Sequence, residues 1–159
     1  MIKNKIKQLK ELKRIVAASK KRGEKVVFTN GCFDIIHLGH IRYLEKASSL
    51  GDKLVVALNS DASERRLKGN TRPIIPEQER AAIAAAFECV DYVIIFAETT
   101  PLRLIKALQP DVLVKGGDWR KPDIVGKDFV ESYGGKVASA GFVKGYSSSS
   151  IIARIKKTK

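Results

Sequence analysis

Short β-branched runs alternate with helical patterns along this chain of 159 residues, and no other feature limits its fold as strongly. A chain in which strands alternate with helices forms a parallel sheet covered on both faces. We therefore predict an α/β fold, an open parallel sheet of about five strands with helices on both faces. The expected strands are KVVFTN (25–30), KLVVALN (53–59), DYVIIF (91–96), the run DVLVKGGDW from residue 111, and KVASA (136–140).

Caps and breakers set the expected helix boundaries. Pro76 and Pro101 suit the first position of a helix, with Thr100 as a cap, and Gly23 and Gly51 end helices. Residues 60–75, with glycine, asparagine and proline but no clean period, are expected to form a long loop. The predicted helices cover residues 2–22, 38–50, 76–89, 101–109, 124–133 and 147–157.

The positive charge of the chain is concentrated at its two ends. The formal net charge is +13, but residues 1–25 hold ten Lys/Arg against Glu11 and Glu24, and residues 153–159 add four more. The body is nearly neutral, so a basic groove for nucleic acid is not expected. The length fits one domain, and we expect a basic amphipathic helix (1–24) before the main domain (25–159).

Cysteine usage and hydropathy indicate a reduced, cytoplasmic setting. Cys32 and Cys89 show no CxxC spacing, which argues against a disulfide framework or a zinc knuckle. No apolar run approaches the length that spans a bilayer, and the lysine-rich N-terminus lacks the apolar segment of a signal peptide. Membrane insertion is therefore not expected.

Polar and glycine-rich segments follow three of the predicted strands, as NGCFD, NSD and KGGDW. Parallel sheets bind ligands beyond the carboxyl ends of their strands, where the strand order reverses. The segment NGCFDIIHLGH (30–40) contains both histidines, and a helix that starts near Leu38 would place His37 before its first turn and His40 within it. Two imidazoles beside a helix N-terminus indicate an anion site, and Gly39 would allow close approach.

The two histidines could instead be metal ligands or core residues. They could bind a metal with Cys32 and Asp34, although the spacing matches no HExxH helix. They could also pack in a polar core without a ligand. A dinucleotide fold is not indicated, because no GxGxxG follows the first strand, and a Walker ATPase is excluded by the lack of GxxxxGK[ST].

The segment GCFDIIHLGH resembles the GxFDxxHxGH signature of the cytidylyltransferase-like nucleotidyltransferases, which have a Rossmann-like fold. GYSSSSII resembles their second motif, GISTT, although Phe142 stands where cytidylyltransferases carry an arginine, a role that Lys144 could take. NSDASERRLKGNTRPIIPEQER and TPLRLIKALQPDVLVKGGDW resemble the adenylyltransferase domains of bacterial ADP-heptose synthases, from about Lys25 to Lys156. In those proteins the domain follows a sugar kinase. Here the resemblance begins at about Lys25, so it implies a stand-alone form.

The resemblance implies transfer of AMP from ATP to a heptose 1-phosphate by in-line attack on the α-phosphorus, with pyrophosphate leaving. Such products are lipopolysaccharide precursors. The histidines would hold the phosphates and stabilise the transition state, and Mg²⁺ would be bridged by phosphate oxygens without a direct protein ligand. A cytoplasmic homodimer is also implied.

The implied site residues fall into three groups. Asp34 could orient a metal or a backbone donor, or cap the turn, and Trp119 could stack on a ligand or serve packing. The catalytic group is His37, His40, Lys68 and Arg80; the nucleotide group is Thr29, Asn30, Gly31, Cys32, Phe33, Asp34, His37, Gly39, His40, Gly117, Asp118, Ser147, Ser148 and Ser149; the substrate group is Asn59, Asp61, Lys68, Arg72, Lys115 and Trp119.

Alternative functions stay open. A sister enzyme would transfer CMP to glycerol phosphate or ethanolamine phosphate, or form FAD. A module of another class would bind nucleic acid through the basic termini, with a steep salt dependence.

Overall fold

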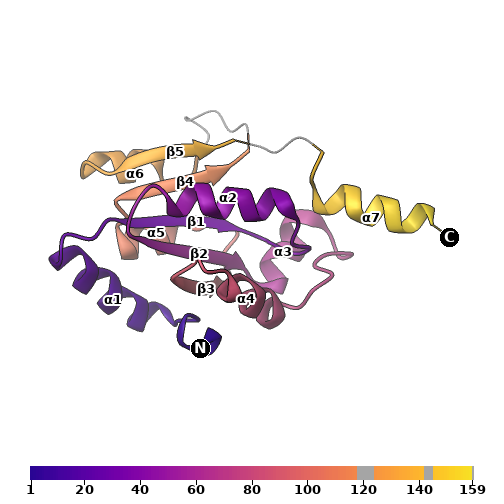
Figure 1. Cartoon of the computed structure of the whole chain (residues 1–159), viewed down its shortest axis with the longest axis horizontal. Helices are drawn as coiled ribbons and strands as arrows, with labels where there is room; N and C mark the ends of the chain where they lie inside the picture. The colour runs from indigo at the N-terminus through magenta and orange to yellow at the C-terminus, as the bar shows by residue number, and fades with distance from the viewer. Residues whose placement is uncertain (118–123, 142–144, 159) are drawn as a thin grey trace.

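The computed structural model describes residues 1–117, 124–141 and 145–158. They fold around one five-stranded parallel sheet. The strands are β1 (Val26–Gly31), β2 (Lys53–Asn59), β3 (Tyr92–Phe96), β4 (Val112–Gly116) and β5 (Lys136–Ala140). Their order is β3-β2-β1-β4-β5 (Figure 1), so the chain reverses its direction of sheet growth between β1 and β4. The predicted fold class and all five predicted strands are confirmed.

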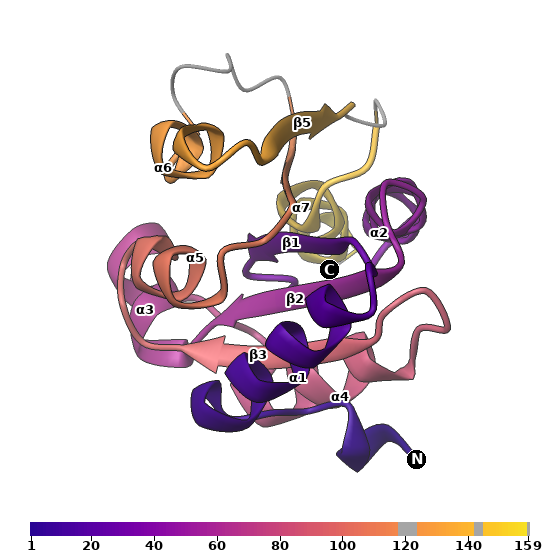
Figure 2. The same ribbon diagram turned by 90° about the vertical axis from the view of Figure 1, so that its left-hand side faces the viewer.

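Helices cover both faces of the sheet (Figures 1 and 2). On one face, α2 and α4 pack against strand residues such as Val112 and Val114; on the other, α1, α5 and α6 pack against residues such as Leu113. Successive strand residues therefore point to opposite faces, as the pleat requires. The helices are η1 (Ile2–Asn4), α1 (Leu9–Lys21), α2 (Leu38–Ser48), α3 (Asp61–Lys68), α4 (Glu77–Ala86), α5 (Leu102–Leu108), α6 (Lys127–Ser132) and α7 (Ser148–Lys157).

The predicted single helix over residues 2–22 is wrong in its first turns. Ile6 forms a parallel bridge to Val93, the Lys7 amide donates to the Val93 carbonyl (2.8 Å), and the Val93 amide donates to the Lys5 carbonyl (2.9 Å). β3 is an edge strand with backbone groups to satisfy, and pairing with them prevents the helix from starting before Leu9. Farther along, α1 buries Leu12 and Val16 in the core.

The predicted loop over residues 60–75 is wrong as well, because it contains α3. Ser60 caps this helix by accepting a hydrogen bond from the Ser63 amide (3.1 Å). Acidic residues in its first turn and basic residues in its last turn complement the helix dipole. These caps and charges stabilise a helix that is too polar to show a hydrophobic period.

Smaller differences concern helix ends. Pro76 and Pro101 are the capping residues of α4 and α5 rather than their first helical residues, so Thr100 does not cap α5. α4 ends at Ala86, three residues before the predicted end at Cys89.

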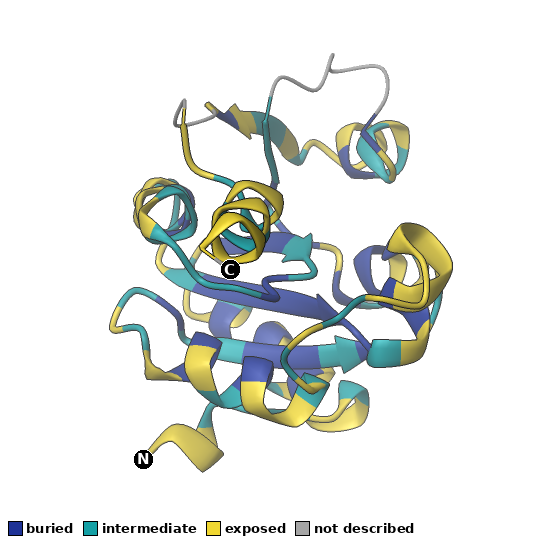
Figure 3. Cartoon of the chain, turned by 90° about the vertical axis from the view of Figure 1, so that its right-hand side faces the viewer, coloured by how far each residue is buried: buried dark blue, intermediate teal, exposed yellow. Residues whose placement is uncertain are grey.

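α7 extends from the end of the sheet at which the carboxyl ends of β1 and β2 lie, and it has no buried residue (Figures 1 and 3). Its start is nevertheless fixed. The Ser147 side chain accepts a hydrogen bond from the Ser150 amide (3.0 Å), and the Ser148 hydroxyl donates to the Ile35 carbonyl (3.1 Å). Within the described residues, no helix is both long and apolar enough to cross a membrane.

Candidate active site

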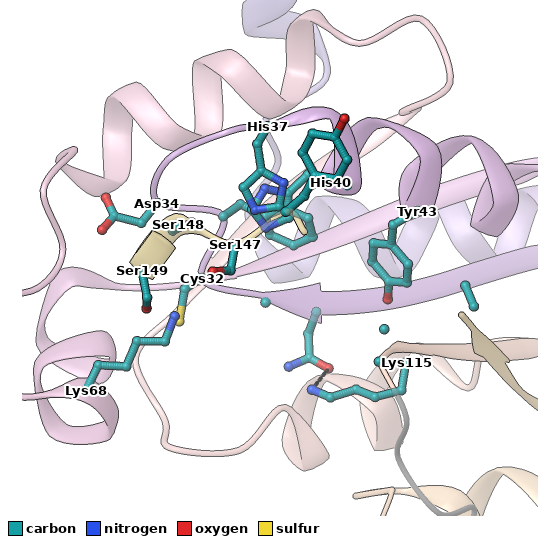
Figure 4. A pocket seen from close by; sticks show the side chains of 18 of the residues that line it. Cys32, Asp34, His37, His40, Tyr43, Lys68, Lys115, Ser147, Ser148 and Ser149 are labelled. Carbon is teal, nitrogen blue, oxygen red and sulfur yellow. Dashed lines mark hydrogen bonds between the residues drawn. The ribbon is translucent and has the colours of Figure 1, made fainter. Parts of the chain in front are cut away.

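A pocket of about 460 Å³ lies at the carboxyl ends of β1 and β4, where the strand order reverses. This is the place at which open parallel sheets bind ligands. Four parts of the chain line it, namely the segment after β1 with α2, the end of α3 and its following loop, the ends of β4 and β5, and the start of α7 (Figure 4). The lining residues are Asn30, Gly31, Cys32, Phe33, Asp34, His37, Gly39, His40, Tyr43, Lys68, Arg72, Lys115, Gly116, Gly117, Ala140, Gly141, Tyr146, Ser147, Ser148 and Ser149.

The turn after β1 depends on a glycine and a buried ring. Phe33 has a left-handed backbone (φ 49°) and a side chain that is only 5% exposed. Its ring folds back over Gly31, where a Cβ would lie 2.8 Å from the Phe33 ring. The ring also packs 5.1 Å from the His40 ring, measured between centroids. The GCF sequence therefore supports one wall of the histidine site.

The two histidine rings are stacked, with centroids 3.9 Å apart and planes inclined by 25°. His37 occupies the cap position of α2 without using its side chain as a cap, and His40 lies one turn farther along. A Cβ on Gly39 would lie 3.0 Å from the His37 ring and 3.2 Å from the Tyr146 Cβ. Gly39 is therefore required by the packing of these two side chains, whether or not a phosphate also approaches it.

Burial favours the neutral form of both imidazoles. Burial lowers the pKa of His40 to about 4, with smaller contributions from His37 and Lys68, and burial also lowers the pKa of His37. The Nδ1 atoms of both rings are buried and have no hydrogen-bond partner within the described structure. Buried polar atoms are usually paired, so these two nitrogens are exceptions beside the pocket.

Asp34 holds the loop after α3. Its buried carboxylate accepts hydrogen bonds from the Ile74 amide (2.9 Å), the Ile75 amide (2.8 Å) and Arg72 Nε (2.7 Å). Burial alone would raise the pKa of Asp34, but these donors lower it below its ordinary value. Asp34 thus orients backbone donors and Arg72, one of the two roles left open for it.

A metal site receives no support from the donor set. The described residues contain no cluster of three or more His, Cys, Asp and Glu side chains that could hold an ion. The Asp34 oxygens already accept three donors, and the Cys32 thiol lies 3.9 Å from the Asn59 side-chain oxygen. Burial raises the pKa of Cys32, which further disfavours a thiolate ligand.

Three cationic side chains line the pocket, and Figure 4 shows two of them, Lys68 and Lys115. Lys68 ends α3, Arg72 follows it, and Lys115 ends β4. Lys115 Nζ lies 3.5 Å from the Asn30 side-chain oxygen, and burial lowers the pKa of this lysine. The N-termini of α2 and α7 also face the pocket, since His37 and Ser147 cap these helices and line it. Cations and helix N-termini together favour a polyanion.

Four predicted site residues lie behind the pocket wall instead of lining it. Thr29 is buried and its hydroxyl bonds to the Tyr43 hydroxyl. The Asn59 amide donates to the Ser63 hydroxyl (2.9 Å). Arg80 is fully buried and pairs with Asp61 (2.8 Å). In this structure these side chains support the site, and direct contacts with a ligand stay predictions.

Arg80 illustrates such support. Its guanidinium donates to the Cys32 carbonyl (2.5 Å) and to the Ile75 carbonyl (2.9 Å), so it joins the turn after β1 to the start of α4. The predicted residues Asp118 and Trp119, as well as Phe142 and Lys144, lie outside the described residues.

Sequence reasoning missed five lining residues, Tyr43, Gly116, Ala140, Gly141 and Tyr146. Tyr43 lies under Gly116, where a Cβ would approach its ring to 3.1 Å. Its hydroxyl donates to the Val114 carbonyl (3.3 Å), and burial raises its pKa to about 12. The helical spacing from His40 to Tyr43 was the available signal, since residues three apart share a helix face.

Known proteins resemble this chain over the residues that form the sheet and the pocket. The family model described as cytidylyltransferase-like matches residues 28–154. The bifunctional protein HldE of Geobacter metallireducens is 61% identical over 151 residues, which are 95% of this chain and 31% of that protein. HldE of Geotalea uraniireducens is 60% identical over 96% of this chain and 31% of its own length. The chain thus spans about a third of the length of these relatives.

Two solved structures share the fold. A lipopolysaccharide core biosynthesis protein from Thermoplasma volcanium superposes with a TM-score of 0.63 at 30% identity, over 79% of this chain and 100% of that one. Pantoate-beta-alanine ligase from Francisella tularensis, in complex with beta-gamma ATP and beta-alanine, has a TM-score of 0.66 at 18% identity, over 95% of this chain and 76% of that one. The second likeness concerns the fold alone.

Proposed function

The chain belongs to the cytidylyltransferase-like family, and from this premise we propose that it transfers AMP from ATP to a heptose 1-phosphate, giving ADP-heptose and pyrophosphate. The observation that carries the proposal is the pocket itself. Two stacked imidazoles with unpaired ring nitrogens, three cations and two helix N-termini surround one space of about 460 Å³. Such a site suits a triphosphate and a second phosphorylated substrate.

The proposed reaction needs positioning and charge stabilisation more than covalent help. An oxygen of the sugar phosphate attacks the α-phosphorus, the bond to the β-phosphate oxygen breaks, and pyrophosphate leaves with that bonding pair. The attacking phosphate is already ionised, so neither histidine has to remove a proton. As neutral imidazoles, His37 and His40 donate hydrogen bonds to phosphate oxygens and stabilise the charge that develops in the transition state.

The cationic side chains and the serines of the pocket are proposed to bind the phosphates. Lys68 and Arg72 reach the pocket from the α3 side, and Lys115 reaches it from β4, so they can neutralise phosphates from opposite walls. The serines at the start of α7 offer hydroxyls and a helix N-terminus to the triphosphate. Mg²⁺ would be held through the phosphates of the substrates and would neutralise part of their charge, because the Asp34 carboxylate in the pocket lining already accepts hydrogen bonds from Arg72 and two backbone amides.

The heptose substrate is supported by the middle of the chain and by the relatives. The segment over residues 59–80 resembles the ADP-heptose synthase adenylyltransferases. Two relatives named HldE are 61% and 60% identical, and a structural relative is named for lipopolysaccharide core biosynthesis. The second candidate, transfer of CMP to an alcohol phosphate, is favoured by the description of the matching family model.

A matrix of substrates separates these candidates. Pyrophosphate release is measured with ATP, CTP, GTP and UTP, each against heptose 1-phosphate, glycerol 3-phosphate, ethanolamine phosphate and FMN. We expect release with ATP and heptose 1-phosphate at least a hundredfold faster than with any other pair. Release that prefers CTP with glycerol 3-phosphate would replace the proposal with the second candidate.

Organisation and assembly belong to the same proposal. We propose a cytoplasmic homodimer, in which the basic N-terminal segment over residues 1–24, containing α1, is attached to the domain over residues 25–159. α7 has no buried residue and its Ile155 is 59% exposed, which supports contact with a second copy. Light scattering of the purified chain should give twice the mass of 17.6 kDa, and a monomer would reject the dimer.

A further inference from the structure

Glu64 is a buried acidic residue that the proposed reaction does not use. α3 places its carboxylate below the pocket, fully buried, and neither oxygen has a hydrogen-bond partner within the described structure. Cations compensate it instead. Its oxygens lie 3.3 Å from Arg80 Nη1, 3.8 Å from Lys68 Nζ and 3.9 Å from Arg72 Nη2. A buried carboxylate compensated only by charge is unusual, because buried charges normally also accept hydrogen bonds.

The three cations differ in how firmly they are held. Arg80 is fully buried and bonded to Asp61, and Arg72 is only 10% exposed and bonded to Asp34. The Lys68 side chain is 45% exposed and lines the pocket, with its ammonium next to the Cys32 thiol (Figure 4). Burial raises the pKa of Cys32, and Lys68 offsets part of that rise. Lys68 can therefore leave Glu64 with the smallest loss of other contacts.

Burial raises the pKa of Glu64, and Lys68 and Arg80 oppose that rise. Charge attraction thus draws the ammonium of Lys68 toward the protein interior when the pocket is empty. A polyphosphate in the pocket offers the same ammonium several negative oxygens, together with hydrogen-bond acceptors in a favourable geometry.

We propose that Glu64 is a positioning residue, an internal counter-ion that holds Lys68 at the pocket wall and competes with bound polyphosphate for its ammonium. This role rests on the proposed function only in that the ligand is a polyphosphate. The competition weakens the binding of ATP and of pyrophosphate alike, and it eases the release of the product.

A double-mutant cycle tests the coupling between the two side chains. Calorimetry measures the binding of ATP and of inorganic tripolyphosphate to the wild type, Glu64→Gln, Lys68→Met and the double variant. We expect Glu64→Gln to tighten binding about fivefold in the wild-type background. In the Lys68→Met background, the same substitution should change binding less than twofold, because the competing ammonium is gone. In turnover, Glu64→Gln should lower the KM for ATP.

A matched control removes one negative charge elsewhere. Glu79 is an exposed residue of α4, and Glu79→Gln should leave the affinity within about 1.5-fold of wild type. Weaker binding by Glu64→Gln would indicate a merely structural role. An equal gain in both Lys68 backgrounds, or a gain no larger than that of Glu79→Gln, would also overturn the proposal.

A second variant and the binding of tripolyphosphate by the wild type cover the cases in which the first experiment fails. If Glu64→Gln does not fold, Glu64→Asp serves instead, because its carboxylate is one methylene farther from Lys68. Glu64→Asp should still tighten polyphosphate binding more than Glu79→Gln does. An unchanged affinity would overturn the proposal. If the wild type binds tripolyphosphate without transferring AMP, the proposed function fails and the cycle still tests Glu64. If it binds neither ligand, both proposals fail.

Discussion

The stacked histidines show how burial sets a chemical role. An exposed imidazole is partly protonated near neutral pH, but the desolvated His40 has a pKa of about 4 and stays neutral. A neutral ring keeps one N–H donor and, having no net charge, does not attract anions from solution. The site therefore keeps its donors available for a phosphate instead of attracting a permanent counter-ion.

His40→Ala should reduce kcat/KM by about a hundred- to thousandfold, because it removes one preorganised donor to the reacting phosphates. The ring is only partly buried, so the fold should persist, which circular dichroism can confirm. A variant whose kcat/KM lies within about threefold of wild type would show that His40 has no catalytic role.

The pKa of His40 also predicts how stability depends on pH. The folded value of about 4 lies below the ordinary value of 6.5, so between these values the unfolded state binds more protons than the folded state. The free energy of unfolding should therefore fall as pH decreases from about 6.5 to about 4, by at most about 1.4 kcal/mol per pH unit from this group. Urea unfolding of the wild type and of His40→Asn checks this. Parallel curves for both proteins in this pH range would reject the assignment.

At the scale of elements, the loop between α3 and α4 is joined to the histidine segment through Asp34. Two backbone amides and Arg72 donate to this one carboxylate, and Arg80 binds both Cys32 and Ile75 from behind. The turn after β1 and the loop after α3 therefore form one connected wall, which places Lys68 and Arg72 toward the pocket.

Asp34→Asn should lower the free energy of unfolding by about 3 kcal/mol, because it removes the carboxylate that pairs at 2.7 Å with the largely buried Arg72 guanidinium. The KM for ATP should also rise, since Arg72 is no longer oriented. Asp128→Asn, at a fully exposed position of α6, serves as the control and should change stability by less than about 0.5 kcal/mol. Equal urea midpoints for the two variants would contradict the role given to Asp34.

Elements with a clear hydrophobic period were predictable from the sequence. Strands β1 to β4 are largely buried runs, and α2 and α7 carry apolar residues at helical spacing. The histidine segment and the serine cap could therefore be placed at a common edge. α3 was missed because caps and charges, not apolar spacing, stabilise it. The break in the N-terminal helix was missed because it depends on the edge of β3, where Val93, the partner of Ile6, lies 87 residues away in sequence.

The candidate site shows the same limit. Residues in contiguous motifs, such as His37, His40 and Ser147, were predictable, and they line the pocket. Arg80 and Asp61 were predicted to contact ligands, but they face each other below the wall, which only the packing of α3 against α4 decides. Tyr43 and Tyr146 were missed because their sequence neighbourhoods resemble ordinary helix and loop.

Across the whole molecule, the basic N-terminal segment is part of the fold. Lys5 and Lys7 pair with Val93 at the sheet edge, and α1 buries Leu12 and Val16 against the sheet. A nucleic-acid-binding function through residues 1–22 is therefore better tested by exchanging exposed lysines than by deleting a segment that contributes to the core.

The central claim is that one pocket brings together a nucleoside triphosphate and a sugar phosphate for direct transfer of a nucleotidyl group. The most direct measurement incubates the chain with ATP, Mg²⁺ and heptose 1-phosphate and follows all products by mass spectrometry and phosphorus NMR. The account predicts ADP-heptose and pyrophosphate in equal amounts, and their loss in the His37→Ala/His40→Ala double variant. ADP and inorganic phosphate as the products, or ADP-heptose formed equally well without both histidines, would contradict it.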